Sequence, residues 1–163
     1  MNRYLIIACL LVVTVGSAAA EWKIALGLAN NGGSSATLSF GAAAGATDGV
    51  DAPLGEVELP PLPPATAFDA RWVQDKGNGL WKDFRAAATE LKWVLQVQAG
   101  SGGYPIRLAW PAEGLPAGEL RLQDAVSGGK VVDVDMKAKS SARLDRAAVD
   151  RLQIVWRQSA QEN

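Results

Sequence analysis

Four acidic residues lie within the eleven positions 48–58 of the chain. Asp48, Asp51, Glu56 and Glu58 supply oxygen ligands of the kind that Ca²⁺ prefers, and Gly49 allows a sharp turn between the first two. The spacing does not complete a twelve-residue calcium loop, and Ca²⁺ takes ~6–8 oxygen ligands. Alternatively, the two aspartates cap turns by accepting hydrogen bonds from their own backbone. Calcium binding and turn capping are therefore the two interpretations of this segment.

A second pair of carboxylates could in principle do acid–base chemistry. Asp133 and Asp135 fall on one face of a predicted strand, and paired carboxylates can act as general acid and general base. Apolar residues alternate with them, so the simpler interpretation is an outward, solvated face. Asp145 and Asp150, on either side of the last turn, are interpreted in the same way.

The chain contains no histidine. This absence removes Ser-His-Asp and Cys-His catalysis and the usual zinc sites. The sequence thus predicts a protein that is not an enzyme. An enzyme of an unrecognised type is the third alternative, after a protein-binding module and a carbohydrate-binding module.

Six tryptophans are many for a chain of 163 residues. Five of them follow the apolar phase of their strands and are predicted to lie in the core: Trp22, Trp72, Trp93, Trp110 and Trp156. Trp81 and Tyr104 stand beside glycine-rich turns, outside a clean alternation, and are the candidates for an exposed binding surface. Neighbours with hydrogen-bonding groups are Asn78, Lys82 and Arg107. Such a surface suits sugar stacking or a protein partner, and the alternative is that the rings anchor the end of the domain.

The first twenty residues have the pattern of a secretory signal. Arg3 precedes an apolar run over 5–15, and Ala18 and Ala20 fit the A-x-A cleavage pattern, which would leave Glu21 as the mature N-terminus. The alternative is an uncleaved N-terminal anchor. Because a membrane helix needs ~20 apolar residues, this run is short for a span.

Cleavage would leave a mature chain of ordinary domain size. Sixteen basic residues include Arg3 in the leader, so 15 remain against 17 acidic residues, a net charge of −2. This balance offers no electrostatic grip on nucleic acid. Cys9 also lies in the leader, so the mature chain has no cysteine for a disulfide, and packing alone must stabilise it.

The dominant hydrophobic period in the mature chain is two, which predicts half-buried strands. Strands are expected over 22–26, 38–40, 68–72, 80–85, 91–98, 106–110, 120–123, 132–136, 142–144 and 152–156. The segment 80–85 is expected to return as a hairpin from the turn at 75–79, and 83–89 is the only stretch that could hold a helical turn. The proline segment 60–64 should cross a sandwich edge as extended backbone. Short strands separated by turns at this spacing favour a β-sandwich, with a five-stranded barrel as the alternative.

The order of these motifs resembles an Ig-like or fibronectin-like β-sandwich module of secreted bacterial proteins, of the kind found near dockerin or sorting-signal segments. The matching features are Leu38-Ser39-Phe40-Gly41, Ala46-Thr47-Asp48-Gly49-Val50-Asp51, the prolines at 60–64 with Phe68, Asp83-Phe84-Arg85, the strand around Trp93, Leu108-Ala109-Trp110, Leu122-Gln123-Asp124 and Val134-Asp135-Met136. The resemblance implies an all-β, antiparallel sandwich over 21–157, between the signal peptide at 1–20 and a polar C-terminal tail at 158–163.

These observations lead to one functional expectation and one alternative. The chain is expected to be a non-catalytic module, exported to the periplasm or cell exterior, that binds a protein or helps assemble a surface structure. The alternative is a carbohydrate-binding module that uses exposed aromatic rings. The partner is thus a protein or a surface polymer or glycan, with no nucleic acid, no membrane span after cleavage, no cofactor apart from Ca²⁺, and no oligomeric state specified.

Overall fold

The computed structural model describes residues 21–147 and 149–159. Within them lie ten strands and one short 3-10 helix: β1 (Trp22–Ala29), β2 (Ser35–Ala42), η1 (Ala52–Leu54), β3 (Asp69–Val73), β4 (Lys82–Arg85), β5 (Glu90–Gln98), β6 (Ile106–Ala109), β7 (Glu119–Asp124), β8 (Asp133–Asp135), β9 (Ser141–Leu144) and β10 (Arg151–Arg157). The predicted signal segment 1–20, with Ala18 and Ala20, and residues 160–163 of the predicted tail lie outside the described residues.

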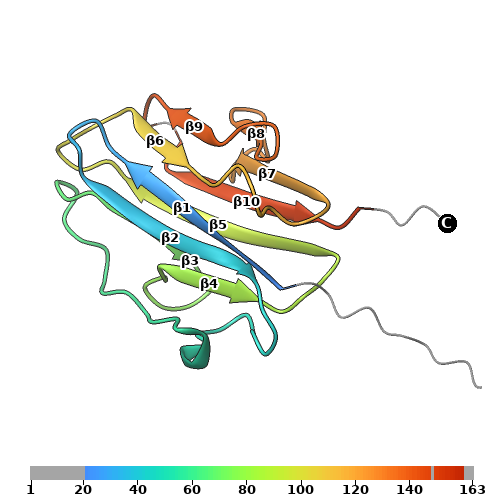
Figure 1. Cartoon of the computed structure of the whole chain (residues 1–163). Coiled ribbons are helices and arrows are strands. Elements are labelled where there is room, and N and C mark those ends of the chain that lie inside the picture. The colour runs from blue at the N-terminus through green and yellow to red at the C-terminus, as the bar shows by residue number, and fades with distance from the viewer. Residues whose placement is uncertain (1–20, 148, 160–163) are drawn as a thin grey trace, which may run out of the picture.

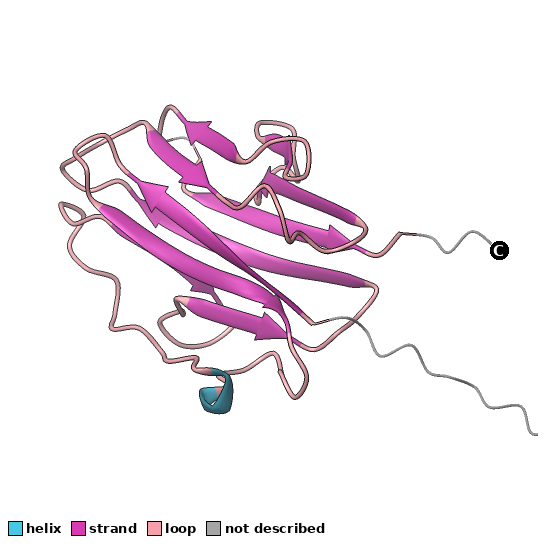
Figure 2. Ribbon diagram, viewed as in Figure 1, coloured by secondary structure: helices cyan, strands magenta, loops and turns pink. Residues whose placement is uncertain are grey.

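The strands form two five-stranded sheets. The first sheet has the order β4-β2-β1-β6-β9, and the second has the order β3-β5-β10-β7-β8. Figure 1 shows the two layers, and Figure 2 shows that strands make up nearly all of the regular structure, with the single helical turn at the lower margin. The prediction of an all-β protein with two packed sheets is confirmed.

Alternation along the long strands builds the core between the layers. In β5, every second residue from Leu91 to Val97 is buried, while the residues between them face outward. The same alternation holds in β1, where Ile24, Leu26 and Leu28 are buried. Because both sheets direct one apolar face inward, each can bury that face only against the other.

An aromatic cluster lies at the centre of this core. Trp22 contacts Phe40 and Trp93 at ring-centroid distances of 6.0 and 5.5 Å, and Phe40 contacts Trp72 at 5.3 Å, all edge to face. The buried indole N–H groups find backbone acceptors, such as the Ser39 carbonyl for Trp72 at 2.9 Å. The five tryptophans expected in the core all lie in it or pack against it.

One strand differs from its expectation. The expected hairpin is limited to one residue pair: Leu80 returns across the turn and forms an isolated antiparallel bridge with Trp72. Residues 82–85 then leave it, and β4 pairs in parallel with β2 of the other sheet. The stretch 83–89, the only one that could hold a helical turn, contains none, because its first three residues belong to β4. Period-two alternation fixes which side chains face inward, but it does not specify the partner strand. All other strand pairs are antiparallel within the described chain.

Candidate functional site

Trp81 is the exception among the six tryptophans, because 54% of it is exposed. It lies directly before β4, the edge strand of the first sheet, beside a shallow hollow of about 380 Å³. The hollow, called the Trp81 hollow below, is lined by Thr37, Ser39, Gly55, Val57, Trp81 and Lys82. Trp81 and its sequence neighbour Lys82 were both predicted at a binding surface, and both line this hollow.

The chain turns Trp81 outward by interrupting the alternation. Leu80 is fully buried, and its backbone exchanges hydrogen bonds with Trp72 of the second sheet. Two residues later, Lys82 stands opposite Ser39 in the first sheet. Trp81 lies where the chain passes from one sheet to the other, and its carbonyl accepts from the Ser39 N–H at 2.8 Å. Its indole N–H has no hydrogen-bond acceptor among the described residues, so the ring is available to a ligand.

A buried carboxylate holds the opposite wall of the hollow in place. Glu56 is 1% exposed and accepts the backbone N–H groups of Asp51 at 2.7 Å and Phe84 at 2.6 Å. Burial raises the pKa of Glu56, and the two backbone hydrogen bonds act against this rise. The bond to Phe84 occupies an edge N–H of β4 that would otherwise lack a partner. Glu56 thereby fixes its neighbours Gly55 and Val57 beside Trp81.

The other predicted calcium ligands are not assembled into one site. The Asp51 carboxylate accepts the Thr47 N–H at 2.6 Å and the Thr47 hydroxyl at 3.0 Å, which is the turn-capping geometry. Glu58 accepts the backbone N–H of Asn78 at 2.7 Å, and Asp48 is almost fully exposed. Across residues 21–147 and 149–159, no group of three or more His, Cys, Asp or Glu residues could hold a metal ion.

Asp83 lies on the inner side of β4. Its carboxylate is nearly fully buried and pairs with Arg85 at 3.0 Å. Burial raises the pKa of Asp83, while its hydrogen bond and attraction to Arg85 act in the opposite direction. This paired position gives Asp83 a structural role at the sheet edge.

Three further candidates lie outside the Trp81 hollow. Asn78 is occupied by the fold: its carbonyl accepts from Arg71 at 2.6 Å and its side chain donates to Glu58 at 3.2 Å. Tyr104 is half-buried and packs against the core just before β6, and burial raises the pKa of its hydroxyl. Arg107 is exposed on the first sheet, two strands beyond β2.

The outer face of the first sheet is formed mainly by small side chains. Its outward positions are Lys23, Ala25, Gly27 and Ala29 in β1, Ser35, Thr37, Ser39 and Gly41 in β2, Lys82 and Phe84 in β4, Arg107 and Ala109 in β6, and Ser141 and Arg143 in β9. The charged residues among these strand positions are all basic. Alanine, glycine, serine and threonine between them leave the middle of the sheet flat.

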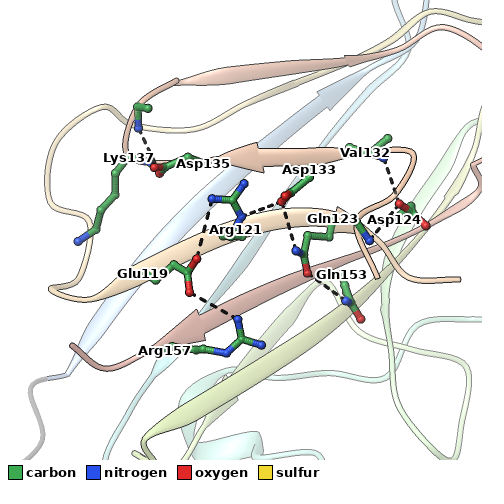
Figure 3. Close-up of polar contacts among 12 residues, drawn as sticks. Glu119, Arg121, Gln123, Asp124, Val132, Asp133, Asp135, Lys137, Gln153 and Arg157 are labelled. Carbon is green, nitrogen blue, oxygen red and sulfur yellow. Dashed lines mark hydrogen bonds and ion pairs between the residues drawn. The ribbon is translucent and has the colours of Figure 1, made fainter. Parts of the chain in front are cut away.

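The outer face of the second sheet carries large side chains that pair with one another (Figure 3). Arg121 contacts Asp133 at 2.7 Å, and Arg157 contacts Glu90 at 2.7 Å and Glu119 at 3.5 Å. The hydrogen bond from Arg121 is the main reason that the pKa of Asp133 is lowered. An ionised, paired Asp133 is poorly suited to donate a proton, and this geometry favours the solvated-face interpretation of the aspartates in β8.

Asp124 organises the loop between β7 and β8. It is 3% exposed, and its two oxygens accept hydrogen bonds from the Ser127 N–H and hydroxyl and from the N–H groups of Gly129, Val131 and Val132. These bonds, led by that from the Ser127 hydroxyl, lower the pKa of Asp124 strongly. Figure 3 shows this carboxylate and its contact to Val132.

A larger hollow, of about 450 Å³, lies at the start of β1 but offers less chemistry. Its lining is mostly apolar, and its two charged residues, Glu21 and Lys23, already interact with other groups of the chain. Glu21 accepts the Ala44 N–H at 3.0 Å, and the Lys23 ammonium lies 5.6 Å from the centre of the Phe84 ring. The Trp81 hollow therefore remains the stronger candidate.

Sequence reasoning named Glu56 only as a calcium ligand and missed its structural role, and it missed Asp124 and the uniform charge of the first sheet's outer face altogether. The outward residues were visible in the sequence as every second position of 23–29 and 35–41. The sequence did not show which strands are neighbours in the sheet, because β6 and β9 lie far along the chain from β1 and β2.

No helix in the described part of the chain is long and apolar enough to cross a membrane. A scan against protein-family models finds no match for this chain, and searches of curated proteins and of solved structures find none either.

Proposed function

We propose that this chain is an exported, non-catalytic binding module of the Ig-like or fibronectin-like kind, and that Trp81 is the centre of its contact surface. The observation that carries the proposal is the exposure of Trp81 beside the Trp81 hollow, while the other five tryptophans serve the core. Tryptophan gives a large, rigid contact area, so an exposed ring beside a hollow is suited to binding.

The chemistry of the hollow favours a carbohydrate as the ligand. Thr37 and Ser39, which carry hydroxyl groups, line the hollow, and Lys82 adds an ammonium group. Trp81 offers its ring face for stacking on the apolar side of a sugar. An aromatic platform with a few polar groups beside it is the combination that a sugar, apolar on one side and hydroxylated at its rim, requires.

A glycan array with the purified protein tests this proposal. We expect binding by the wild-type protein, loss of that binding in Trp81→Ala, and no change in Val126→Ala. Val126 is 88% exposed on the loop between β7 and β8, so it controls for the loss of an exposed apolar side chain elsewhere. Equal binding by wild type and Trp81→Ala would contradict the proposal.

A protein partner or surface assembly is the second candidate, and one observation favours it. Val57, 60% exposed, lines the same hollow as Trp81, so two exposed apolar side chains meet there. Exposed apolar residues that cluster in this way are a feature of protein interfaces. If this candidate is right, one defined envelope protein should be retained by wild type and lost with both Trp81→Ala and Val57→Asp, while the glycan array stays empty.

A further inference from the structure

Positive charge is concentrated on one face of a chain that is not basic overall. Lys23, Lys82, Arg107 and Arg143 are the charged residues at outward strand positions of the first sheet, and no acidic residue occupies such a position there within the described residues. The whole chain carries 16 basic and 17 acidic residues. This face is therefore basic although the chain is close to neutral.

Two of these cations stand directly opposite each other. Arg107 of β6 pairs in register with Arg143 of β9, and both are exposed. Like charges at directly opposite positions destabilise a sheet. Arg143 has an ion pair with Asp145, which follows β9, whereas Arg107 has no ion pair among the described residues. An anion bound between the two guanidinium groups would remove this repulsion.

The arginine pair and the Trp81 hollow lie on the same side of the first sheet. Three strand spacings separate β4 from β6, or roughly 14 Å. The floor between them is made of small residues, including Gly27, Ala109 and the hydroxyl residues Thr37 and Ser39. An extended polymer that stacks on Trp81 can reach the arginines across this floor without meeting a large side chain.

We propose that the ligand of this face is a carboxylated polysaccharide, with one sugar stacked on Trp81 and carboxylates further along the polymer paired with Arg107 and Arg143. This inference rests on the proposed carbohydrate binding and specifies its substrate class. The charge of the face selects an anionic polymer. The hydroxyl-lined floor offers hydrogen bonds and few large apolar side chains, and thus favours a glycan over an acidic protein segment, whose binding would call for more apolar anchors.

Calorimetric titration with a matched pair of ligands tests the proposal. The ligands are an oligogalacturonate and the same oligosaccharide with its carboxylates methyl-esterified, which keeps the sugar and removes the charge; an alginate oligomer serves as a second carboxylated glycan. We expect the wild-type protein to bind the carboxylated form about tenfold more tightly than the ester, because Arg107 gains an ion pair and Arg143 contacts a second carboxylate beside Asp145.

Two double variants separate the effect of position from the effect of charge. Arg107→Gln with Arg143→Gln should weaken binding of the carboxylated form about tenfold and leave binding of the ester unchanged. Lys92→Gln with Arg151→Gln removes two exposed cations from the outer face of the second sheet and should change neither.

Each outcome decides the matter. Equal binding of acid and ester, or an unchanged affinity in the Arg107/Arg143 variant, would overturn this inference; if Trp81→Ala still abolished binding, carbohydrate recognition itself would stand. Tight binding of poly-L-glutamate that does not depend on Trp81 would point to an acidic protein segment instead. No binding of any of these glycans would overturn this inference, whereas the proposed carbohydrate binding falls only if the glycan array is empty as well.

Discussion

On the outer face of the second sheet, Arg121 and Arg157 each lie between carboxylates, whereas on the outer face of the first sheet Arg107 stands opposite another arginine. The strand positions of the second face hold five acids, Asp69, Glu90, Glu119, Asp133 and Asp135, and five bases, Arg71, Lys92, Arg121, Arg151 and Arg157. The charged residues at the strand positions of the first face are all basic. Both sheets contribute apolar side chains to the same core.

The two faces differ in how their charges are arranged: Arg121 and Arg157 on the second face are paired with carboxylates, whereas Arg107 on the first face is paired in register with another cation. On the second face, side chains largely satisfy one another, so an incoming ligand would have to break existing contacts (Figure 3). On the first face, a ligand would relieve repulsion and occupy the Trp81 hollow. Substitutions should therefore affect stability more on the second sheet and binding more on the first.

The largest effect on stability is expected at Asp124. Asp124→Ala removes the acceptor for five donors in the loop between β7 and β8 and should lower the melting temperature by roughly 5–10 °C. Asp133→Ala, an exposed aspartate of the adjoining strand, is the matched control and should cost only a few degrees. Thermal unfolding followed by circular dichroism measures both, and equal shifts would remove the special role of Asp124.

Glu56 is the corresponding test near the Trp81 hollow. Glu56→Ala leaves the Asp51 and Phe84 N–H groups without their acceptor and should lower the free energy of unfolding by about 1–3 kcal/mol. It should also weaken ligand binding, because Gly55 and Val57 lose their support. Glu58→Ala is the control, because Glu58 lies in the same loop and its hydrogen bonds to Asn78 are exposed. If it reduced stability as much as Glu56→Ala, burial would not be the deciding factor.

Acid titration should show two opposing contributions to stability. Glu56 and Asp83 have raised pKa values, so the folded chain gains stability as the pH falls through those values toward the ordinary 4.5 and 3.8. Asp124 has a lowered pKa, so its contribution is present above its ordinary value of 3.8 and is lost as the pH falls below it. Denaturant melts at several pH values check both contributions.

Two isosteric variants test which residue is responsible for each part of the pH dependence. Asp124→Asn should flatten the loss of stability below pH 3.8, and Glu56→Gln should flatten the gain on the higher-pH side. A wild-type curve that rises steadily from pH 4 to 7 would show that other groups govern the titration.

The smallest effect on stability is expected at Arg107, and its sign is the informative part. Arg107→Gln removes a like-charge pair and should raise the free energy of unfolding by a few tenths of a kcal/mol. Arg121→Gln on the second sheet should instead lower it by about 0.2–1 kcal/mol. If both variants lost stability to the same extent, the two faces would not differ as described.

The sequence allowed the sandwich to be predicted because burial follows the period of two. Leu91 to Val97 and Leu152 to Ile154 alternate cleanly, and their strands lie where expected. The exposure of Trp81 was also predictable, since it interrupts that alternation.

Pairing between distant strands was not predictable from local pattern. The parallel pairing of β4 with β2 depends on Leu80 bridging one sheet while Lys82 joins the other. The roles of Glu56 and Asp124 depend on backbone N–H groups that a loop brings within reach, and the Arg107–Arg143 pair depends on the neighbour order β6-β9. Tyr104 was a candidate because it stands beside a glycine-rich turn, and Asn78 because it could offer hydrogen bonds near an exposed ring. In the structure, Tyr104 packs against the core and Asn78 is hydrogen-bonded within the fold.

Chemical-shift mapping of the isotope-labelled protein, titrated with an oligogalacturonate, tests most directly whether the first sheet carries the binding surface. The perturbed backbone amides should lie in β1, β2, β6 and β9 and at Trp81, with the indole N–H of Trp81 among the largest shifts and β5, β7 and β10 unchanged. Perturbations concentrated on β5, β7 and β10, or none at saturating ligand, would contradict the account.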